Sequence, residues 1–299
     1  MFQKFFKDKL RLLKKSIISR NLDIICVSAF GSYNYNLNFE TSDMDFKLVY
    51  VPTLEDLLNQ RKQSEIVNLG NIGDCELIAL PYFINCLKMF DLCKFEVLFA
   101  QYISVEEKHA KLFEDIKECA KLMIMNNKLS FADSVLTTSD KIYKTFINNK
   151  LNVYNAKKAY NIPRLKLLLN SVIFADTYEL TVDVSTEEGN EIKSMKLGNV
   201  ERDDVRIITE VIIKRIEEMK QDLSDNGKME FESKLDDLVK IEQMRKFNEA
   251  EELKKQEMKV ERRKRKAMMR GNEEICRFLV FNMLMLGFSF IVALYWVFN

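Results

Sequence analysis

The stretch VSAFGSYNYNLNFETSDMDFKLVYV, from Val27 to Val51, decides the fold of this chain. One apolar run ends at Gly31 and Ser32, and a second begins directly after Asp43 and Asp45. Short continuous runs rich in β-branched residues are typical of buried strands. Side chains two residues apart in a strand project to the same face, so the two carboxylates should aim at one point. The pattern predicts two strands, one ending in Gly-Ser and the next opened by Asp-x-Asp.

This pair of acids suits a metal site. Adjacent carboxylates repel each other unless a cation neutralises them, and hard oxygen ligands select Mg²⁺ or Mn²⁺. A third acid can come from Asp74 or Glu76, because residues 65–80 form a pattern of two strands around a Gly-Asn turn. Two ions held in this way orient a triphosphate and activate an attacking oxygen. An isolated Asp-x-Asp is more often an ordinary surface turn, and the flanking strands are what favour a site here.

The Gly-Ser turn suits the phosphate-binding part of such a site. Because Gly31 has no side chain, backbone N–H groups and the Ser32 hydroxyl can approach phosphate oxygens closely. The turn therefore predicts a place for nucleotide phosphates next to the acids.

The composition of the chain limits the kinds of site and partner that it can have. The chain has 299 residues, of which 47% are hydrophobic, enough for a buried core. Its 46 basic and 45 acidic residues nearly balance, so any attraction to a charged partner must be local. His109 is the single histidine, which excludes sites built on several imidazoles. The six cysteines form no Cys-x-x-Cys pair and indicate reduced, cytosolic thiols.

The order of the elements predicts an α+β fold. Residues 1–104 contain an amphipathic first helix and then strands, and we expect a catalytic core built on a small mixed or antiparallel sheet. Residues 105–223 should form a helical bundle that binds substrate or nucleotide. Residues 224–272 are polar and should form a solvated spacer helix or a weak coiled coil. The basic first helix could mimic a targeting segment, but it lacks the long apolar stretch of a signal peptide.

The C-terminal region, residues 275–299, predicts a membrane anchor. No charged residue occurs from Phe278 to Phe298, a length that matches the hydrocarbon core of a bilayer. The positive-inside rule would keep the basic run at residues 259–270 in the cytoplasm, in contact with anionic lipid. That run could instead be a nuclear address or a nucleic-acid patch. We expect a single-pass, tail-anchored membrane protein with its N-terminal domain in the cytoplasm.

The stretch FGSYNYNLNFETSDMDFKLVYV resembles the signature of the DNA polymerase β nucleotidyltransferase superfamily, in which Gly-Ser precedes a spaced Asp-x-Asp. More closely, the chain is similar to a group of predicted bacterial and phage nucleotidyltransferases. Later blocks of that group resemble DCELIAL, FEVLFA, NAKKAYNIPRLKLLLN, and ELTVDV with EIKSMKLGNV, in the same order. The likeness covers about residues 27–219, and its first block is the most specific.

The resemblance implies roles for two sets of residues. The catalytic and metal-binding acids would be Asp43, Asp45 and Asp74, with Glu76 as the second choice for the third carboxylate. The nucleotide would be bound by Gly31, Ser32, Lys157 and Arg164. The last two lie seven residues apart, so both could face one cleft or simply belong to a solvated helix face. Two features depart from the group: Asn161 stands where relatives often carry histidine, and the apolar tail is unusual.

The expected reaction is transfer of a nucleotidyl group from NTP to an acceptor with loss of pyrophosphate. Asp74 could also accept the proton of the acceptor. RNA, a small molecule, a protein side chain and a second nucleotide all remain open as acceptors. Two rival functions are a membrane-tethered scaffold that binds nucleotide or protein without catalysis, and a coiled-coil adaptor that acts through residues 229–269.

Overall fold

The computed structural model describes the backbone of residues 2–39, 42–58, 63–148, 154–175, 177–225 and 229–298. Within these ranges, nothing is described of the side chains of residues 2, 54, 71, 229, 267 and 269–298. The chain divides into two units, Met1–Gln243 and Met244–Asn299.

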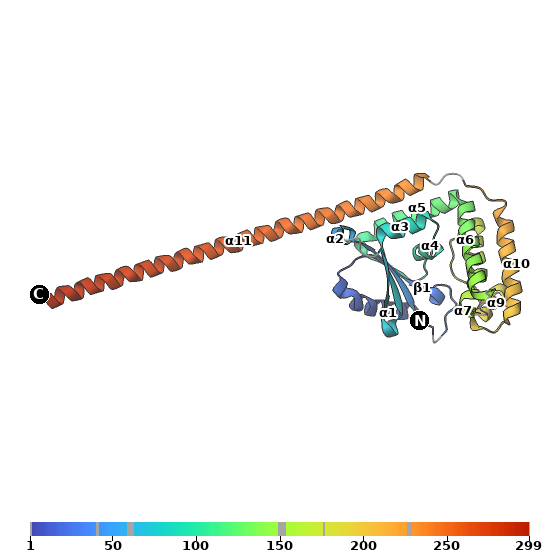
Figure 1. Cartoon of the computed structure of the whole chain (residues 1–299), viewed down its shortest axis with the longest axis horizontal. Helices are drawn as coiled ribbons and strands as arrows, with labels where there is room; N and C mark the ends of the chain where they lie inside the picture. The colour runs from blue at the N-terminus through green and yellow to red at the C-terminus, as the bar shows by residue number, and fades with distance from the viewer. Residues whose placement is uncertain are drawn as a thin grey trace. The chain divides into compact units, whose positions relative to one another are not determined.

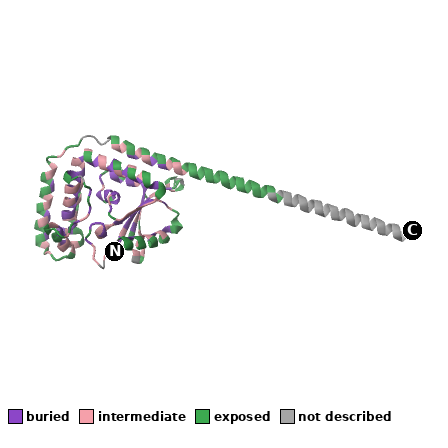
Figure 2. Cartoon of the chain, turned by 180° about the vertical axis from the view of Figure 1, so that it is seen from behind, coloured by how far each residue is buried: buried purple, intermediate pink, exposed green. Residues whose placement is uncertain are grey.

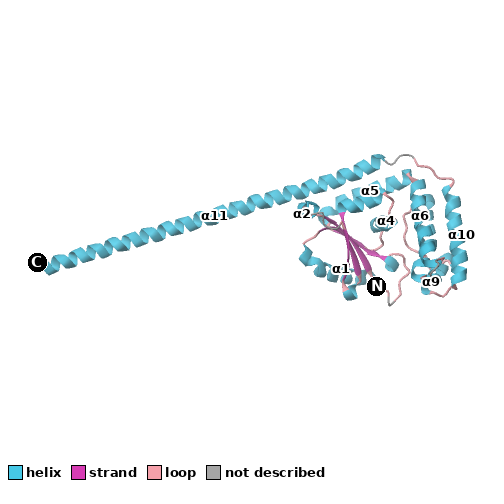
Figure 3. Ribbon diagram, in the orientation of Figure 1, coloured by secondary structure: helices cyan, strands magenta, loops and turns pink. Residues whose placement is uncertain are grey.

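The elements of the described residues alternate between helix and strand in the first third of the chain and are helical afterwards (Figures 1 and 3). The strands are β1 (Asp23–Phe30), β2 (Asp45–Val51), β3 (Ser64–Asn68), β4 (Asp74–Ala79) and β5 (Ile103–Val105). The longer helices are α1 (Phe2–Ile17), α3 (Leu80–Lys88), α5 (Ala110–Asn126), α6 (Lys128–Ile142), α8 (Asn161–Asn170), α9 (Glu187–Leu197), α10 (Arg202–Lys220) and α11 (Met229–Phe298). The shorter ones are α2 (Leu54–Leu58), α4 (Leu92–Leu98), α7 (Ala156–Ala159), and the 3-10 and π turns η1 (Ile18–Arg20), η2 (Gly31–Tyr33), η3 (Gly70–Ile72), η4 (Glu107–His109), η5 (Tyr143–Ile147) and η6 (Ser171–Ala175).

The five strands form one mixed sheet in the order β3-β4-β2-β1-β5. Strand β1 runs antiparallel to β2 and β5, β4 runs antiparallel to β3, and the central pair β2 and β4 is parallel. The predicted strands on either side of the Gly-Ser and Asp-x-Asp motifs are therefore present and adjacent. A mixed sheet followed by helices confirms the α+β class.

The two faces of the sheet pack against different helices. On one face, alternate residues of β1 and β2 such as Val27 and Leu48 pack against Leu13 of α1. The amphipathic pattern of α1 explains this arrangement, since its apolar stripe is buried while its lysines stay outside. On the other face, Val49 and Ile78 join the core of the helical part of the unit. Figure 2 shows buried residues both on the strands and on the helices beside them.

This second face changes from polar to apolar along each central strand. In β2 it carries Asp45, Lys47 and then Val49, and in β4 it carries Asp74 and Glu76. The parallel register pairs Lys47 with Glu76, so their side chains point to the same side. The polar end is where β2 and β4 both begin and where β1 ends, because Phe30 pairs with Asp45. The chain therefore gathers its strand-borne acids at one end of one face.

The helical part of the first unit contains the predicted bundle. Helices α6, α8 and α10 contact one another, and Figure 1 shows α6 and α10 side by side. Their shared core includes Val135, Leu165 and Ile216. Helix α7 packs on α9, which brings the lysine pair of NAKKAY close to the EIKSMKLGNV segment. This contact matters for the site described below.

Helix α11 begins inside the first unit. Leu235 is fully buried and Val239 is 9% exposed, while residues 248–266 are exposed. The division between the units falls within α11, after Gln243, whereas the sequence pattern placed the start of a solvated spacer at residue 224. The difference arises because the first turns of α11 carry enough apolar residues to join the core.

Among the described residues, no helix combines the length and the apolarity needed to cross a bilayer. The predicted span from Phe278 to Phe298 lies in the part of α11 whose side chains are outside the description. The membrane anchor therefore stays a prediction.

Candidate active site

Asp45 and Asp74 stand at the beginning of the two parallel central strands. The backbone N–H of Asp74 donates a hydrogen bond to Oδ1 of Asp45, with 3.4 Å between nitrogen and oxygen. Gly73, which precedes β4, allows this approach: a Cβ atom there would lie 2.3 Å from the carbonyl oxygen of Met44. The two strands can begin this close together only because residue 73 has no side chain.

Gly31 lies on the other side of Asp45. Its φ of +72° belongs to the left-handed region, which glycine adopts at little cost. This conformation turns the chain from β1 into η2, and a Cβ on Gly31 would lie 3.6 Å from Oδ2 of Asp45. The carboxylate of Asp45 is thus flanked by the Gly-Ser turn and by Asp74, as the sequence motif predicts. Ser32 follows in the turn, where its carbonyl oxygen accepts hydrogen bonds from Tyr35 and Leu37.

The three aspartates form one electrostatic cluster. Burial raises the pKa of Asp45, and the negative charges of Asp74 and Asp43 raise it further. The backbone N–H of Asp74 and the ammonium group of Lys158 act in the opposite direction. The raised pKa means that the ionised form of Asp45 is poorly compensated by the protein itself, which is the condition that a bound cation relieves.

Asp43 and Asp74 are both exposed, whereas Asp45 is half-buried. Asp74 Oδ1 accepts a 2.7 Å hydrogen bond from Nδ2 of Asn68, across the β3–β4 pair. Among the described residues, the one group with three metal-binding side-chain types within 4.8 Å of one another is elsewhere, at Asp23, His109 and Glu242. Asp43, Asp45 and Asp74 are therefore neighbours whose oxygens are more widely spread.

Glu76 has a different environment from Asp74. Its carboxylate receives Lys94 Nζ at 2.7 Å, Lys47 Nζ at 3.3 Å and the hydroxyl of Ser64 at 2.8 Å. Burial opposes ionisation, but the two lysines and the hydrogen bonds outweigh it and lower the pKa of Glu76. Both lysines are almost fully buried, so they need this counter-charge. The geometry favours Asp74 over Glu76 as the third carboxylate of the candidate site.

Arg164 is also held by a buried partner. Its Nη1 lies 2.7 Å from Oε1 of Glu96, its guanidinium group stacks 3.9 Å from the ring centre of Tyr35, and Nε donates to Asn161. The side chain is 7% exposed. Lys157, by contrast, is exposed on α7. The structure does not bring Arg164 and Lys157 together on one open face, because α7 and α8 are separate short helices.

Three lysines of α7 and α9 lie near one another, and one of them acts on Asp45. Lys157 and Lys158 belong to α7, and Lys158 interacts electrostatically with Asp45. Lys196 of α9 donates to the carbonyl oxygen of Leu37 at 2.6 Å. Burial and the charge of Lys157 lower the pKa of Lys196 to about 8. An ammonium group that is half-buried beside a like charge is poised to bind an anion.

Aromatic side chains connect this basic group to the acids. Nζ of Lys196 lies 4.8 Å from the ring centre of Phe39 and 5.7 Å from that of Tyr160. Tyr160 is buried, and its pKa is raised by burial and, among other groups, by the charge of Asp45. Acids, lysines and aromatic rings therefore share one region of the first unit.

The sequence reasoning missed Lys158, Tyr160 and Lys196. Two of them had a visible signal, since Lys158 and Tyr160 belong to the same KKAY stretch as Lys157. Lys196 lies in a stretch that resembles the last block of the family, but no pattern in the sequence indicates that its side chain reaches back to Leu37, 159 residues earlier. No protein-family model matches the chain, and no curated protein matches it.

Proposed function

We propose that this protein is a membrane-anchored, metal-dependent nucleotidyltransferase of the polymerase β-like type. The observation that carries the proposal is the position of Asp45 between Gly31 and Asp74, with Lys158 close enough to act on its pKa. Acidic groups at the start of two parallel strands, next to a glycine turn and opposite lysines, suit a metal-bound polyphosphate better than a neutral ligand.

The donor set fits Mg²⁺ or Mn²⁺. Carboxylate oxygens are the ligands these ions prefer, and Asp43, Asp45 and Asp74 would hold them. The pKa of Asp45 is raised chiefly by burial and further by the charges of Asp74 and Asp43, and a bound cation would oppose these effects. When bound, such ions stabilise the charge that develops on the phosphoryl oxygens and activate the attacking oxygen.

The groups of the chain itself would bind and orient the nucleotide. The glycine at position 31 and the hydroxyl of Ser32 allow close approach of phosphate oxygens. The ammonium groups of Lys157, Lys158 and Lys196 would neutralise the remaining negative charge of the triphosphate. Asp74 is exposed and adjacent to Asp45, so it is our choice for accepting the proton of the acceptor. The buried pair of Glu96 with Arg164 would support the site by fixing α4 against α8.

The acceptor remains open among RNA, a small molecule, a protein side chain and a second nucleotide. The tail from Phe278 to Phe298 would keep the reaction at a membrane surface, with residues 259–270 against anionic lipid and the N-terminal domain in the cytoplasm. Carbonate washing of membranes tests this part: the full chain should stay in the membrane fraction, and a chain ending at residue 277 should be released. Retention of the shortened chain would contradict the anchor.

The activity is tested with the full chain in detergent, NTP and Mg²⁺, by measuring pyrophosphate release with each class of acceptor. Asp45→Asn should lower the rate at least about 100-fold, because it removes the central carboxylate of the metal site. The matched control is Asp115→Asn, an acid on α5 that pairs with Lys111 on the helix surface, and it should leave the rate unchanged. Metal-independent NTP binding without turnover would support the tethered scaffold instead.

A further inference from the structure

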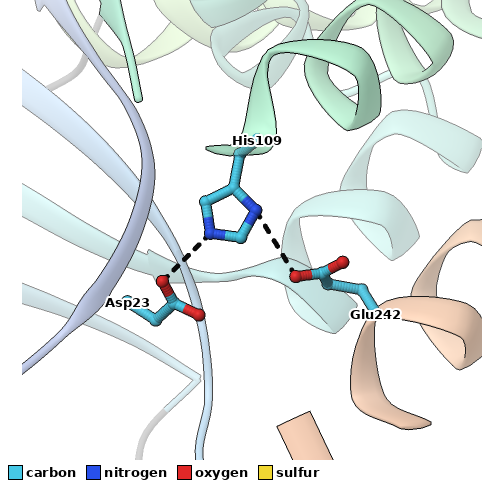
Figure 4. Close-up of side chains that lie close together, drawn as sticks. All are labelled: Asp23, His109 and Glu242. Atoms are coloured by element: carbon cyan, nitrogen blue, oxygen red, sulfur yellow. Dashed lines mark hydrogen bonds and ion pairs between the residues drawn. The ribbon is translucent and has the colours of Figure 1, made fainter. Parts of the chain in front are cut away.

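Three buried side chains meet at the end of β1 that is remote from the candidate active site. Figure 4 shows His109 of η4 between Asp23 of β1 and Glu242 of α11. Asp23 pairs with Val51, at the opposite end of the strand pair from Phe30 and Asp45. With a rise of about 3.3 Å per residue, the two ends of β1 are about 23 Å apart. Any ligand at this cluster is therefore distinct from one at Asp45.

The cluster has the contacts of a cation site. His109 Nε2 lies 3.0 Å from Oδ1 of Asp23, and Nδ1 lies 3.4 Å from Oε1 of Glu242. One ligand atom from each side chain lies within 4.8 Å of the other two. The side chains of Asp23, His109 and Glu242 are 4%, 1% and 8% exposed. Two carboxylates and an imidazole at this spacing form a donor set typical of Zn²⁺ and other first-row divalent metals.

A bound cation would reduce the cost of burying Asp23 and Glu242 together. Two carboxylates buried together are costly unless positive charge compensates both. Lys108 forms an ion pair with Asp23, but its side chain is 59% exposed, and it contributes one charge. A metal ion bound by both acids would supply further positive charge.

The spacing of the acids is compatible with a shared ion. The two N–H bonds of an imidazolium diverge, so oxygens placed on both N–H axes at ordinary hydrogen-bond distances would be about 8 Å apart. Here an oxygen of Asp23 and an oxygen of Glu242 lie within 4.8 Å of each other and of one ring nitrogen. Three ligand atoms this close to one another could hold one ion.

We propose that Asp23, His109 and Glu242 bind one Zn²⁺-like transition-metal ion that cross-links β1, η4 and the first part of α11. One ring nitrogen and one oxygen of each carboxylate would be the ligands. Lys108 can turn to solvent when the ion binds, because most of its side chain is already exposed. The imidazole donor separates this site from the all-carboxylate site at Asp45, since imidazole suits Zn²⁺ and oxygen ligands suit Mg²⁺.

The test uses the full chain in detergent, stripped with chelator and titrated with Zn²⁺ and with Co²⁺. We expect one high-affinity Zn²⁺ per chain in the presence of millimolar Mg²⁺, and visible d–d absorption from the Co²⁺ form. His109→Gln and Glu242→Gln should each weaken Zn²⁺ binding at least about ten-fold. Asp45→Asn is the matched control, because it alters the other acidic site and should leave Zn²⁺ binding unchanged.

A second readout remains valid if a variant fails to fold. His109 is the single histidine, so the imidazole ¹⁵N resonances of the unaltered protein report on this site alone. Zn²⁺ should move one nitrogen to the shift of a metal-bound imidazole and leave the other protonated. A ring with both nitrogens protonated, before and after Zn²⁺, would overturn the proposal, and so would Zn²⁺ affinity that is undiminished in both glutamine variants.

Discussion

Oδ1 of Asp45 accepts a 3.4 Å hydrogen bond from the backbone N–H of Asp74, so the first residues of two parallel strands are tied together at their polar end. The bond brings a second acid next to a half-buried carboxylate that already has a raised pKa. The hydrogen bond favours the ionised form of Asp45, but the negative charge of Asp74 opposes it, and a bound cation would relieve that repulsion. This relationship is the feature from which the proposed metal-dependent chemistry follows.

Replacing Gly73 with alanine should disturb this relationship directly. The new Cβ would lie 2.3 Å from the carbonyl oxygen of Met44, so β2 and β4 would have to move apart. We expect a loss of about 1–3 kcal/mol in stability and, because positioning of reacting groups is so sensitive, a fall in transfer rate of up to about 100-fold.

Gly70→Ala is the control for this change. Gly70 also has a positive φ, but a Cβ there meets nothing within 4 Å, so only backbone strain of about 1 kcal/mol is expected. Transfer rates and thermal unfolding of the two variants should be compared side by side. Equal rates in both would contradict the role given to the close approach of the strands.

Asp45→Asn should stabilise the metal-free protein at pH 7. Since burial and neighbouring acids raise the pKa of Asp45, the folded state binds its proton more tightly than the unfolded chain does. The free energy of unfolding therefore rises as the pH falls through the pKa that Asp45 has in the folded state. Above that pKa, the ionised carboxylate of Asp45 destabilises the folded state. Removing the charge should raise the melting temperature at pH 7, where about 2–4 °C corresponds to 1 kcal/mol in a domain of this size.

The rise in melting temperature of Asp45→Asn should disappear at acid pH. It should shrink when Mg²⁺ is added, because the ion stabilises only the unaltered site. Calorimetry at pH 4 and pH 7, with and without Mg²⁺, measures both effects. A melting temperature that falls in the metal-free variant at pH 7 would contradict the assigned electrostatics.

Nucleotide binding should weaken above pH 8. The pKa of Lys196 is lowered to about 8 by burial and by Lys157, so its ammonium group is lost as pH rises through that value. A triphosphate bound by Lys196 then loses its attraction to this ammonium group. KM for NTP should therefore rise between pH 7 and pH 9. Lys196→Arg stays charged over the whole range and should give a flatter profile. The same rise in KM in both proteins would exclude Lys196 from triphosphate binding.

Arg164→Ala should be strongly destabilising. It leaves the Glu96 carboxylate, 1% exposed, without the guanidinium group that compensates its charge, and loss of one partner of such a pair costs about 3–5 kcal/mol. Urea unfolding measures the effect, and the double variant Arg164→Met with Glu96→Gln should recover part of it, since no buried charge is then left alone. Unaltered stability together with a raised KM for NTP would instead support the contact between Arg164 and the nucleotide that was expected from the sequence.

The sequence was a good guide to the sheet and to the acids on it. The alternation of Asp45, Lys47 and Val49 predicts which face each side chain occupies, because a strand has a fixed period of two. The φ of Gly31 likewise follows from the turn that its position requires. These are local rules, so a single stretch of sequence contains them.

Long-range partners could not be predicted in the same way. Arg164 and Glu96 are 68 residues apart, and both lie in helices whose periodicity does not reveal which partner a buried charge has. The spacing of Lys157 and Arg164 suggested one helix face, but the chain forms two short helices there. The cluster of Asp23, His109 and Glu242 depends on the packing of α11, for which the sequence predicted a solvated helix from its start.

The most direct test of the central claim compares ATP labelled at the α-phosphorus with ATP labelled at the γ-phosphorus, incubated with the full chain, Mg²⁺ and acceptor candidates. Nucleotidyl transfer predicts that the α label joins the acceptor and that the γ label leaves in pyrophosphate, with both events lost in Asp45→Asn. Transfer of the γ label to an acceptor, or α-label transfer that persists in Asp45→Asn, would contradict the account.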